Sequence, residues 1–252
     1  DSTALQVYAN VTNIYDIGRK NGYGIKNSFS FYLKDYTEHN LYDVVYLAYN
    51  PSLIYKETLY TAELVLGFDT LVLGKNKFLS STSIMPRIEY NHSPTLRSLA
   101  HLKLQEKRFE REAQEDLDAR RIELSYGIQN LLSPRSYLQG NIFYINEDSL
   151  RGTNIYVNFD EYKVNGSYAN QFTSTYGINL HAQLRNRKYK DFSSGFNSVR
   201  DDKGILTTFD VTMKVMPTLR LKLGTSYEYI KSNQERFSYK KHIISAGVIK
   251  TF

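Results

Sequence analysis

The chain has 252 residues, of which 41% are hydrophobic, 14% aromatic and 23% charged, a composition that excludes an intrinsically disordered protein. It contains no Cys, which excludes disulfide scaffolds, thiolate zinc sites and cysteine nucleophiles. The formal net charge of +6 is dispersed without a basic run, so we expect no nucleic acid among its partners.

Aromatic residues are numerous but of two kinds only, with 22 Tyr, 13 Phe and no Trp. Tyr favours strands, and its amphipathic ring suits a boundary between apolar and wet surroundings. No run approaches 18 consecutive apolar residues, so the sequence predicts no transmembrane helix. No linker or change of composition marks a boundary, and we expect a single domain over residues 1–252.

Alternation of apolar and polar residues recurs along the whole chain and predicts strands. It is clearest at residues 219–229, LRLKLGTSYEY, where leucines and tyrosines alternate with Arg, Lys and Glu. The pattern predicts thirteen strands, at residues 3–15, 25–36, 42–55, 58–72, 78–91, 95–108, 118–130, 136–146, 156–170, 173–189, 204–216, 218–231 and 239–252. Residues 107–121 could form one or two helical turns, but we interpret them as a charged hairpin tip.

Short and long connections alternate between these strands. The tight ones fall at residues 55–57, 91–94, 132–135, 171–173 and 216–218, and the longer ones at 37–41, 109–117, 147–155, 190–203 and 232–238. This alternation is typical of outer-membrane barrels, which have short periplasmic turns and longer outer loops.

Alternation alone fits a soluble sandwich or barrel as well as a membrane barrel. The predicted strands are about 12 to 16 residues long, where a globular strand averages about five or six. Their polar sides carry charges of both signs, and aromatic residues stand near strand ends, where they would form girdles: Tyr15, Tyr36, Tyr42, Tyr55, Tyr90, Tyr189 and Phe237. We predict an all-β, antiparallel up-and-down transmembrane β-barrel of about 12 to 14 strands.

The strand count raises a question of parity, because single-chain bacterial barrels have even numbers of strands. Thirteen strands imply either that one is miscounted, giving 12, or that another precedes residue 1, giving 14. The start of the sequence, DSTALQVYAN, has no basic segment followed by an apolar one, so we expect that any secretion signal has already been removed.

The alternation assigns a set of charged residues to the lumen. A charged ring that selects solutes is one interpretation, and simple wetting of the lumen by polar residues that pair across strands is the other. The basic members give the set a positive bias, which favours anionic or zwitterionic cargo. The candidate pore-lining residues are Arg97, His101, Lys103, Arg121, Glu123, His181, Arg185, Arg220, Lys222 and Glu228.

We expect no enzyme, metal or cofactor. His92 and Ser93 could be a base and a nucleophile, but neighbouring strand residues point to opposite faces, and Pro94 indicates a tight turn. The histidines lack metal-ligand spacing. The acidic run 110–118 could bind a cation loosely, but we interpret it as a solvated loop.

The last strand ends at Phe252, and its alternation orients each residue. Ile244, Ala246, Val248 and Phe252 are expected to face lipid, whereas Ser245, Gly247 and Thr251 face the lumen. Pairing of this strand with the first would remove an exposed edge. Lys250 lies on the lipid-facing register, from which it can reach the headgroups.

The closing hairpin, residues 226–252, resembles the end of outer-membrane barrels that follow a periplasmic tetratricopeptide domain. These are the surface lipoprotein assembly modulators and related export porins. The resemblance rests on Ser232–Asn233, on Tyr239 with Lys240 and Lys241, and on Lys250–Thr251–Phe252, and it covers roughly the last tenth of the chain. Ser245, Gly247 and Phe252 resemble the last-strand signal of the barrel assembly machinery, from which the chain departs at Lys250.

The resemblance implies a barrel of about 14 strands that helps move a macromolecule to the surface, with a helical-repeat domain upstream. Our leading hypothesis is an outer-membrane polar channel or translocation conduit of a Gram-negative bacterium. Its expected partners are outer-membrane lipid, the barrel assembly machinery and an exported surface protein, lipoprotein or polysaccharide. A passive general porin and a soluble or surface all-β binding protein are the alternatives.

Overall fold

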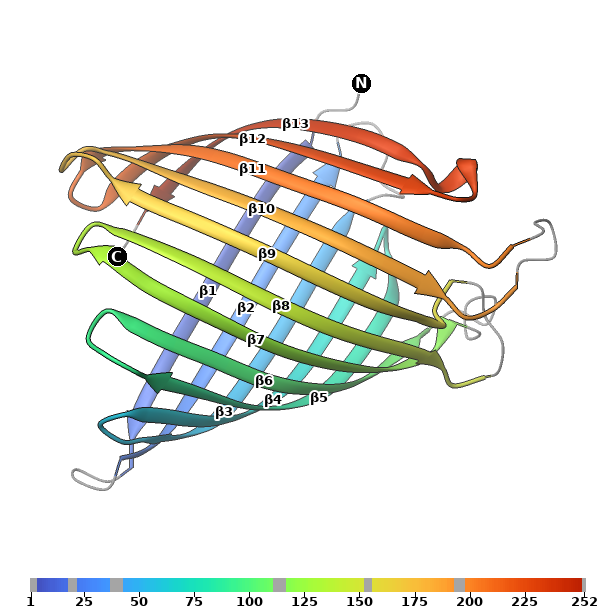
Figure 1. Ribbon diagram of the computed structural model, residues 1–252, viewed down its shortest axis with the longest axis horizontal. Helices are drawn as coiled ribbons and strands as arrows, with labels where there is room; N and C mark the ends of the chain where they lie inside the picture. The colour runs from blue at the N-terminus through green and yellow to red at the C-terminus, as the bar shows by residue number, and fades with distance from the viewer. Residues whose placement is uncertain are drawn as a thin grey trace. The chain divides into compact units, whose positions relative to one another are not determined.

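The computed structural model describes residues 4–17, 22–36, 43–110, 117–151, 156–192 and 198–250. This part of the chain consists of β-strands and their connections, with a short 3-10 turn, η3 (Glu235–Phe237), before the last strand (Figure 1). The strands are β1 (Ala4–Asp16), β2 (Tyr23–Tyr36), β3 (Val44–Lys56), β4 (Tyr60–Leu73), β5 (Asn76–Asn91), β6 (Leu96–Phe109), β7 (Ala119–Ser133), β8 (Ser136–Ser149), β9 (Phe159–Gln171), β10 (Tyr176–Tyr189), β11 (Asp201–Met216), β12 (Leu219–Ser232) and β13 (Tyr239–Lys250).

All thirteen predicted strands are present, with ends within three residues of the predicted ones. The predicted tip at residues 107–121 is flanked by β6 and β7, and its residues 111–116 lie outside the described part of the chain. Among the described residues, no helix is long and apolar enough to cross a membrane.

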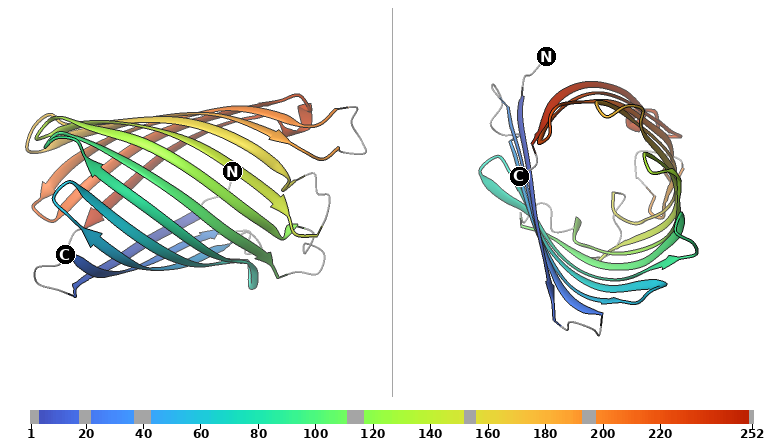
Figure 2. Two further views of the ribbon diagram at one scale, coloured as in Figure 1. Left: turned by 60° about the horizontal axis from the view of Figure 1, so that its bottom comes forward. Right: turned by 90° about the vertical axis from the view of Figure 1, so that its left-hand side faces the viewer.

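The strands form one antiparallel sheet in which hydrogen-bonded order follows chain order from β1 to β13. Figures 1 and 2 show β1–β5 side by side, and likewise β9–β13. The sequence predicts that the last strand pairs with the first, whereas in this structure β1 and β13 are the two edges of the sheet.

The chain forms two compact units. Unit 1 contains Asp1–Tyr90, Ala100–Leu124 and Asn146–Asn158, and unit 2 contains Asn91–Leu99, Ser125–Ile145 and Phe159–Phe252. Strands β6, β7 and β8 therefore contribute to both units. The expectation of a single domain stays a prediction.

In unit 1, β4 places its charged residues on one face and its most exposed apolar residues on the other. On β4, Glu63 and Val65 are 5% and 7% exposed, whereas Leu64 and Leu66 are 39% and 41% exposed. We call the face that carries Glu63 the polar face and the face that carries Leu64 the apolar face. The usual arrangement of a soluble protein is inverted here, because the buried side chains include the charged ones.

Unit 2 shows the same inversion. On its polar face, Glu161 of β9 and Asp202 of β11 are each 2% exposed. On its apolar face, Leu184 of β10, Leu223 of β12 and Ile244 of β13 are 58%, 63% and 78% exposed. In both units, then, a ladder of large exposed hydrophobic side chains lies opposite buried ionic groups.

Connection lengths alternate as predicted, with two exceptions. The connection 17–22 between β1 and β2 has six residues at the end where the other connections are short. The connection 74–75 joins β4 and β5 at the end where the other connections are long, including 110–118, 150–158 and 190–200. Gly74 has a φ of 62°, as a two-residue hairpin turn requires, and its N–H donates to the carbonyl oxygen of Asp43 at 2.8 Å.

The predicted aromatic girdle is only partly supported. Tyr15 and Tyr90 are 71% and 40% exposed near strand ends, and Tyr42 lies outside the described residues. Tyr189 is an error of that assignment, because it is 6% exposed and packs with Phe159 and Ile145 in a small buried cluster. The reason is its register, since it continues the row of His181, Arg185 and Arg187 on the polar face of β10.

Gly22 provides a test of the β1–β2 turn. Its φ is 72°, and a Cβ atom added there would lie 2.1 Å from the carbonyl oxygen of Lys56. We expect Gly22→Ala to destabilise the folded protein by more than the roughly 1 to 2 kcal/mol of the left-handed backbone alone. Urea unfolding in detergent measures this difference. Gly140→Ala is the control, because its Cβ would meet nothing closer than 4.0 Å; equal effects of both changes would contradict the assignment.

Candidate functional site on the polar face

A buried carboxylate ties together four strands of unit 1. Glu63 of β4 accepts a hydrogen bond from Ser52 of β3 at 2.5 Å and pairs with Lys26 of β2 at 2.8 Å. The guanidinium of Arg87 on β5 donates from Nε to the other carboxylate oxygen at 2.7 Å. Both oxygens of Glu63 therefore have charged donors, which offsets the cost of burying the carboxylate.

A second acidic side chain continues this pattern along the same face. Asp69 of β4 accepts hydrogen bonds from the hydroxyl groups of Tyr46 at 3.0 Å and Ser81 at 2.9 Å. Gln105 of β6 then donates to Ser81 at 2.9 Å. Polar contacts on the face thus connect β3 to β6 through side chains that alternate with apolar residues.

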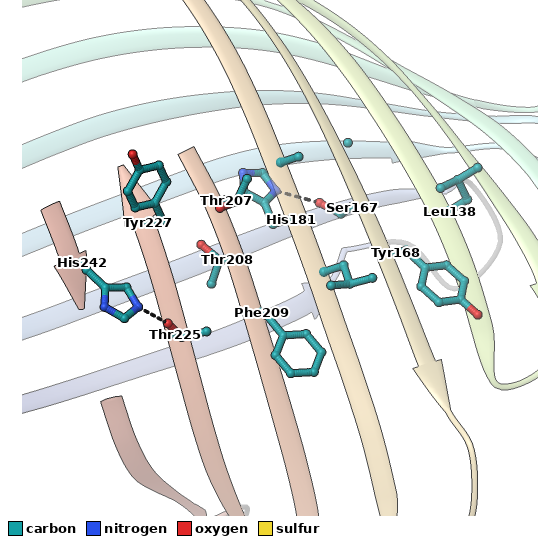
Figure 3. A pocket seen from close by; sticks show the side chains of 13 residues that line it. Leu138, Ser167, Tyr168, His181, Thr207, Thr208, Phe209, Thr225, Tyr227 and His242 are labelled. Carbon is teal, nitrogen blue, oxygen red and sulfur yellow. Dashed lines mark hydrogen bonds between the residues drawn. The ribbon is translucent and has the colours of Figure 1, made fainter. Parts of the chain in front are cut away.

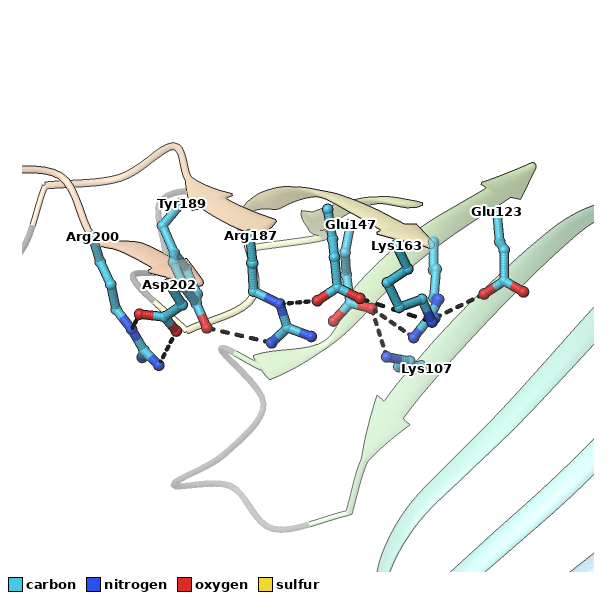
Figure 4. A network of polar contacts seen from close by, with 10 residues as sticks. Lys107, Glu123, Glu147, Lys163, Arg187, Tyr189, Arg200 and Asp202 are labelled. Atoms are coloured by element: carbon cyan, nitrogen blue, oxygen red, sulfur yellow. Dashed lines mark hydrogen bonds and ion pairs between the residues drawn. The ribbon is translucent and has the colours of Figure 1, made fainter. Parts of the chain in front are cut away.

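The strands β6, β7 and β8 of unit 1 carry a denser ionic network. Glu147 is 4% exposed and pairs with Lys107 at 2.6 Å and with Arg121 at 3.8 Å. Arg121 also contacts Glu123 at 2.8 Å, and the imidazole of His101 lies 3.2 Å from the same carboxyl group. Figure 4 shows Lys107 directed at Glu147. Two acids and two permanent cations therefore balance each other, with His101 beside them.

In unit 2, Glu161 of β9 is the most deeply buried acid of another network. Arg187 of β10 donates to it at 2.6 Å, and Lys163 lies at 3.8 Å. The guanidinium carbon of Arg187 is 4.1 Å from the centre of the Phe159 ring. Arg187 therefore combines an ion pair with a cation–π contact. A planar guanidinium group is better suited to this combination than an ammonium group.

Arg200, directly before β11, makes the next group of contacts at this end of unit 2. Its guanidinium bonds Asp202 through two nitrogens, at 3.0 Å and 2.5 Å (Figure 4). It also lies 4.5 Å from the ring centre of Tyr189 and 3.6 Å from that of Phe237. This bidentate pair fixes the end of the long connection to β11 against aromatic rings from two other segments.

The structure places the candidate pore-lining residues on the polar faces of their units by strand register. In unit 1, His101, Arg121 and Glu123 come together in one network, and Lys103 follows His101 in register. In unit 2, four of the remaining candidates contact separate partners on that face: Arg97 bonds Gln129, His181 bonds Ser167, Lys222 pairs with Asp210, and Glu228 accepts a hydrogen bond from Tyr239. Arg185 and Arg220 lie on the same face by register. That they line a pore stays a prediction.

Several members of these networks were missed by the sequence assignment of the site. Lys26, Lys107, Glu147, Glu161, Arg187 and Asp202 all lie on the polar face. The signal was present, because each occupies the polar phase of an alternating strand. It was overlooked where the strand ends were drawn too short, as at Glu147 and Asp202, which lie beyond the predicted ends of β8 and β11.

The turn at His92 and Ser93 uses its polar groups for structure. The Ser93 hydroxyl accepts hydrogen bonds from the backbone N–H groups of Leu96 at 3.0 Å and Thr95 at 3.2 Å. The imidazole of His92 lies 2.9 Å from the hydroxyl of Ser98. These are the contacts of a serine turn, as expected from the residue types.

Residues 111–116 of the acidic run lie outside the described part of the chain, but its two ends have cationic neighbours. Glu110 contacts Lys77 at 2.7 Å, and the Lys77 ammonium and the Ser80 hydroxyl lower the pKa of the Glu110 carboxyl. Asp118 lies within 3.5 Å of both Arg108 and Arg151. Within the described ranges, no group of three His, Asp or Glu residues could hold a metal ion.

The apolar face of unit 2 contains a groove of about 630 Å³ (Figure 3). Leu180, Phe209 and Tyr227 line it together with a polar pair, His242 and Thr225, whose Nε2 and Oγ1 atoms are 2.8 Å apart. The pairing satisfies two polar groups on a face that is otherwise apolar.

The proposed assembly signal is described only in part. Ser245 and Gly247 face the polar side of β13, opposite Gly224 and Lys222, and Phe252 lies outside the described residues. Ile244 and Val248 lie on the apolar face with exposures of 78% and 66%, as the alternation predicted.

No protein-family model and no curated protein matches the chain. Solved structures do. A loop L8 deletion mutant of OmpT, an outer membrane protein of Vibrio cholerae, superposes with a TM-score of 0.58 at 9% identity, over 98% of this chain and 96% of that one. The CymD monoaromatic hydrocarbon channel gives a TM-score of 0.52 at 8% identity, over 99% of this chain and 87% of that one.

The chain has the fold of outer-membrane β-barrels. CdiB from Acinetobacter baumannii also matches, with a TM-score of 0.54 at 9% identity, over 98% of this chain and 54% of that chain. The predicted fold class is thus confirmed, as is the broad resemblance to outer-membrane barrels. At such low identity the likeness shows the fold alone. The resemblance of the closing hairpin to surface lipoprotein assembly modulators stays a prediction.

The Glu63 network can be tested by removing its acid. Glu63→Ala leaves Lys26 and Arg87 facing each other without a carboxylate, and we expect it to destabilise the protein by about 3 kcal/mol in detergent unfolding. Glu57→Ala, in the short turn after β3, should cost less than about 1 kcal/mol. A small effect at Glu63 would mean that water, not this carboxylate, balances the two cations.

Proposed function

We propose that this protein is an outer-membrane channel of a Gram-negative bacterium, with the polar faces of its strands turned to an aqueous lumen and the apolar faces to lipid. One observation carries the proposal: buried ionic networks such as that of Glu63 lie opposite large exposed hydrophobic side chains such as Leu64 and Leu66. A soluble all-β protein would bury the apolar face and expose the charged one.

The lengths of the strands fit this arrangement. Strands of 12 to 16 residues exceed the roughly 9 to 11 that a tilted strand needs to span a bilayer. Pairing of β13 with β1 in the membrane belongs to the proposal, because an open edge in hydrocarbon would leave backbone groups without partners.

Charge suggests which solutes the channel prefers. The acids of the unit 1 networks are matched by cations, whereas the polar face of unit 2 carries additional basic residues. Lys214 and Arg220 lie opposite each other in the β11–β12 register, next to Lys222, whose own charge is matched by Asp210 at 2.9 Å. A surplus of fixed positive charge raises the local concentration of anions, so we propose an anion preference.

Planar-bilayer recording tests the channel and its selectivity together. The native protein should conduct steadily and favour anions, and Arg97→Glu with Arg220→Glu should shift its reversal potential in a salt gradient toward cation selectivity. The matched control is Lys203→Glu with Lys240→Glu, which changes the charge equally on the apolar face and should leave the reversal potential unchanged.

Two outcomes would contradict the proposal. Unchanged selectivity in the Arg97 and Arg220 variant would mean that these residues do not lie along the conduction path. A protein that stays in solution without detergent, and whose gel migration is not changed by heating, would instead be the soluble or surface binding protein of the alternative hypothesis.

A role in surface export is a second candidate, favoured by the closing hairpin, residues 226–252, which resembles that of export barrels linked to tetratricopeptide domains. In this case the channel would pass a surface protein, lipoprotein or polysaccharide. We also propose that the barrel assembly machinery recognises the last strand through Ser245, Gly247 and Phe252. Catalysis is not part of either proposal, since matched structures such as CymD are named as channels.

Deletion of the gene separates export from passive diffusion. An export barrel should be closed or plugged in bilayer recordings, and its deletion should remove one class of macromolecule from the cell surface while general permeability is unchanged. Loss of small-solute uptake with an intact set of surface molecules would favour the passive porin.

A further inference from the structure

Three lysines gather on the apolar face of unit 2, at the end of the strands that bears the long connections. Lys203 of β11 and Lys231 of β12 are directly opposite in register, and Lys240 of β13 is opposite Tyr229, two residues before Lys231. All three are exposed. We call Lys203, Lys231 and Lys240 the lysine cluster.

Two like charges directly opposite each other on neighbouring strands repel and destabilise a sheet. Among the described residues, none of the three lysines has an acidic partner, and the one charge-related contact is the Lys240 ammonium, 5.5 Å from the ring centre of Tyr229. Asp201 lies on this face two residues before Lys203 and, like Asp160, opposite Lys188 in register, but no ion pair joins either acid to the cluster among the described residues. The cluster therefore presents uncompensated positive charge.

Unit 1 provides a contrast on its own apolar face, also next to a long connection. There, Arg108 and Arg120 share the carboxylate of Glu106, at 2.7 Å and 3.5 Å. Outward-facing cations are thus compensated by the protein itself in one unit. Within the described part of the chain the lysine cluster has no such paired acid, and an anion from outside the chain would supply the missing counter-charge.

A groove of about 490 Å³ joins the cluster to the apolar surface. Lys203, Lys231 and Asn186 line its end near the long connections, and the next row toward the middle of the strands is Val164, Leu184, Ile205 and Tyr229. Polar donors therefore stand directly above aliphatic side chains. Polar side chains near the connections and aliphatic side chains toward the middle of the strands match the charged headgroup and the acyl chains of a lipid.

We propose that the lysine cluster binds the phosphate group of a membrane lipid headgroup, with an acyl chain of that lipid lying along Val164, Leu184 and Ile205. A phosphate monoester carries a charge of about −1.5 to −2, enough to remove the repulsion between Lys203 and Lys231. The lysines act as point charges that need no fixed geometry, and Asn186 adds a neutral donor. The inference requires the apolar face to lie in a membrane, and thus rests on that part of the proposed function.

Native mass spectrometry of the protein in neutral detergent tests the site, with diphosphorylated lipid A as the probe. We expect the native protein to retain the lipid, and Lys203→Gln with Lys231→Gln to weaken binding by at least about tenfold, since each lysine near an anionic headgroup contributes roughly fivefold. Lys240→Gln should add a further loss. Lysine-to-arginine changes at the same positions should restore binding.

The controls separate this site from general attraction to a basic protein. Arg108→Gln with Arg120→Gln removes two outward-facing charges that are already paired, and should leave lipid binding unchanged. Lipid A without phosphates should not bind measurably, and millimolar inorganic phosphate should not displace the lipid, because it lacks the acyl chain. Equal losses in both double variants, or full competition by free phosphate, would overturn the proposal.

A charge reversal gives a sharper result. Without anionic lipid, Lys231→Glu should raise the melting temperature in detergent, since the introduced carboxylate would attract the Lys203 ammonium where the native pair repels. With lipid A present, the same variant should lose the stabilisation that the native protein gains. A variant that still gains this stabilisation overturns the site, whereas failure of the native protein to fold in detergent would refute membrane insertion itself.

Discussion

Compensation of buried carboxylates by cations on neighbouring strands is the interaction on which this structure depends. Glu63, Glu147, Glu161 and Asp202 are each 5% exposed or less, and each meets at least one Arg or Lys from the described residues. A buried acid that lost its partner would be strongly destabilising. Because the partners come from other strands or from chain connections, the same contacts that satisfy the charges also hold neighbouring strands in one register.

The strands and their two faces could be predicted from the sequence, whereas the contacts between strands could not. A period of two residues is visible in a single strand, so the thirteen strands and the two faces followed from residues such as Leu64 and Glu63 without any knowledge of their neighbours. Strand ends were less certain, because β8 and β11 each continue three residues beyond their predicted ends. The rows containing Glu147 and Asp202 were lost for this reason.

The candidate site was predicted less completely than the fold, since alternation gives the face of a residue but not its partner. That Arg87 meets Glu63 on the next strand follows from the β4–β5 register, which depends on the turn at Gly74 together with the register shift between Leu71 and Val72. Tyr189 shows the opposite failure. Its position at a strand end suggested an interfacial aromatic, but its row places it against Phe159 and beneath the guanidinium of Arg200. A residue's environment in a sheet is set by two strands at once.

The two-residue turn between β4 and β5 has a consequence for the order in which unit 1 is built. A loop this short costs little entropy to close, so this hairpin can form before strands that are joined by long connections. Once it forms with the register shift between Leu71 and Val72, Arg87 lies opposite Glu63. A slip of one residue would place the Arg87 side chain on the apolar face, away from the Glu63 carboxylate. Closure of this hairpin in the correct register would thus give the neighbouring strands a correctly aligned edge on which to pair.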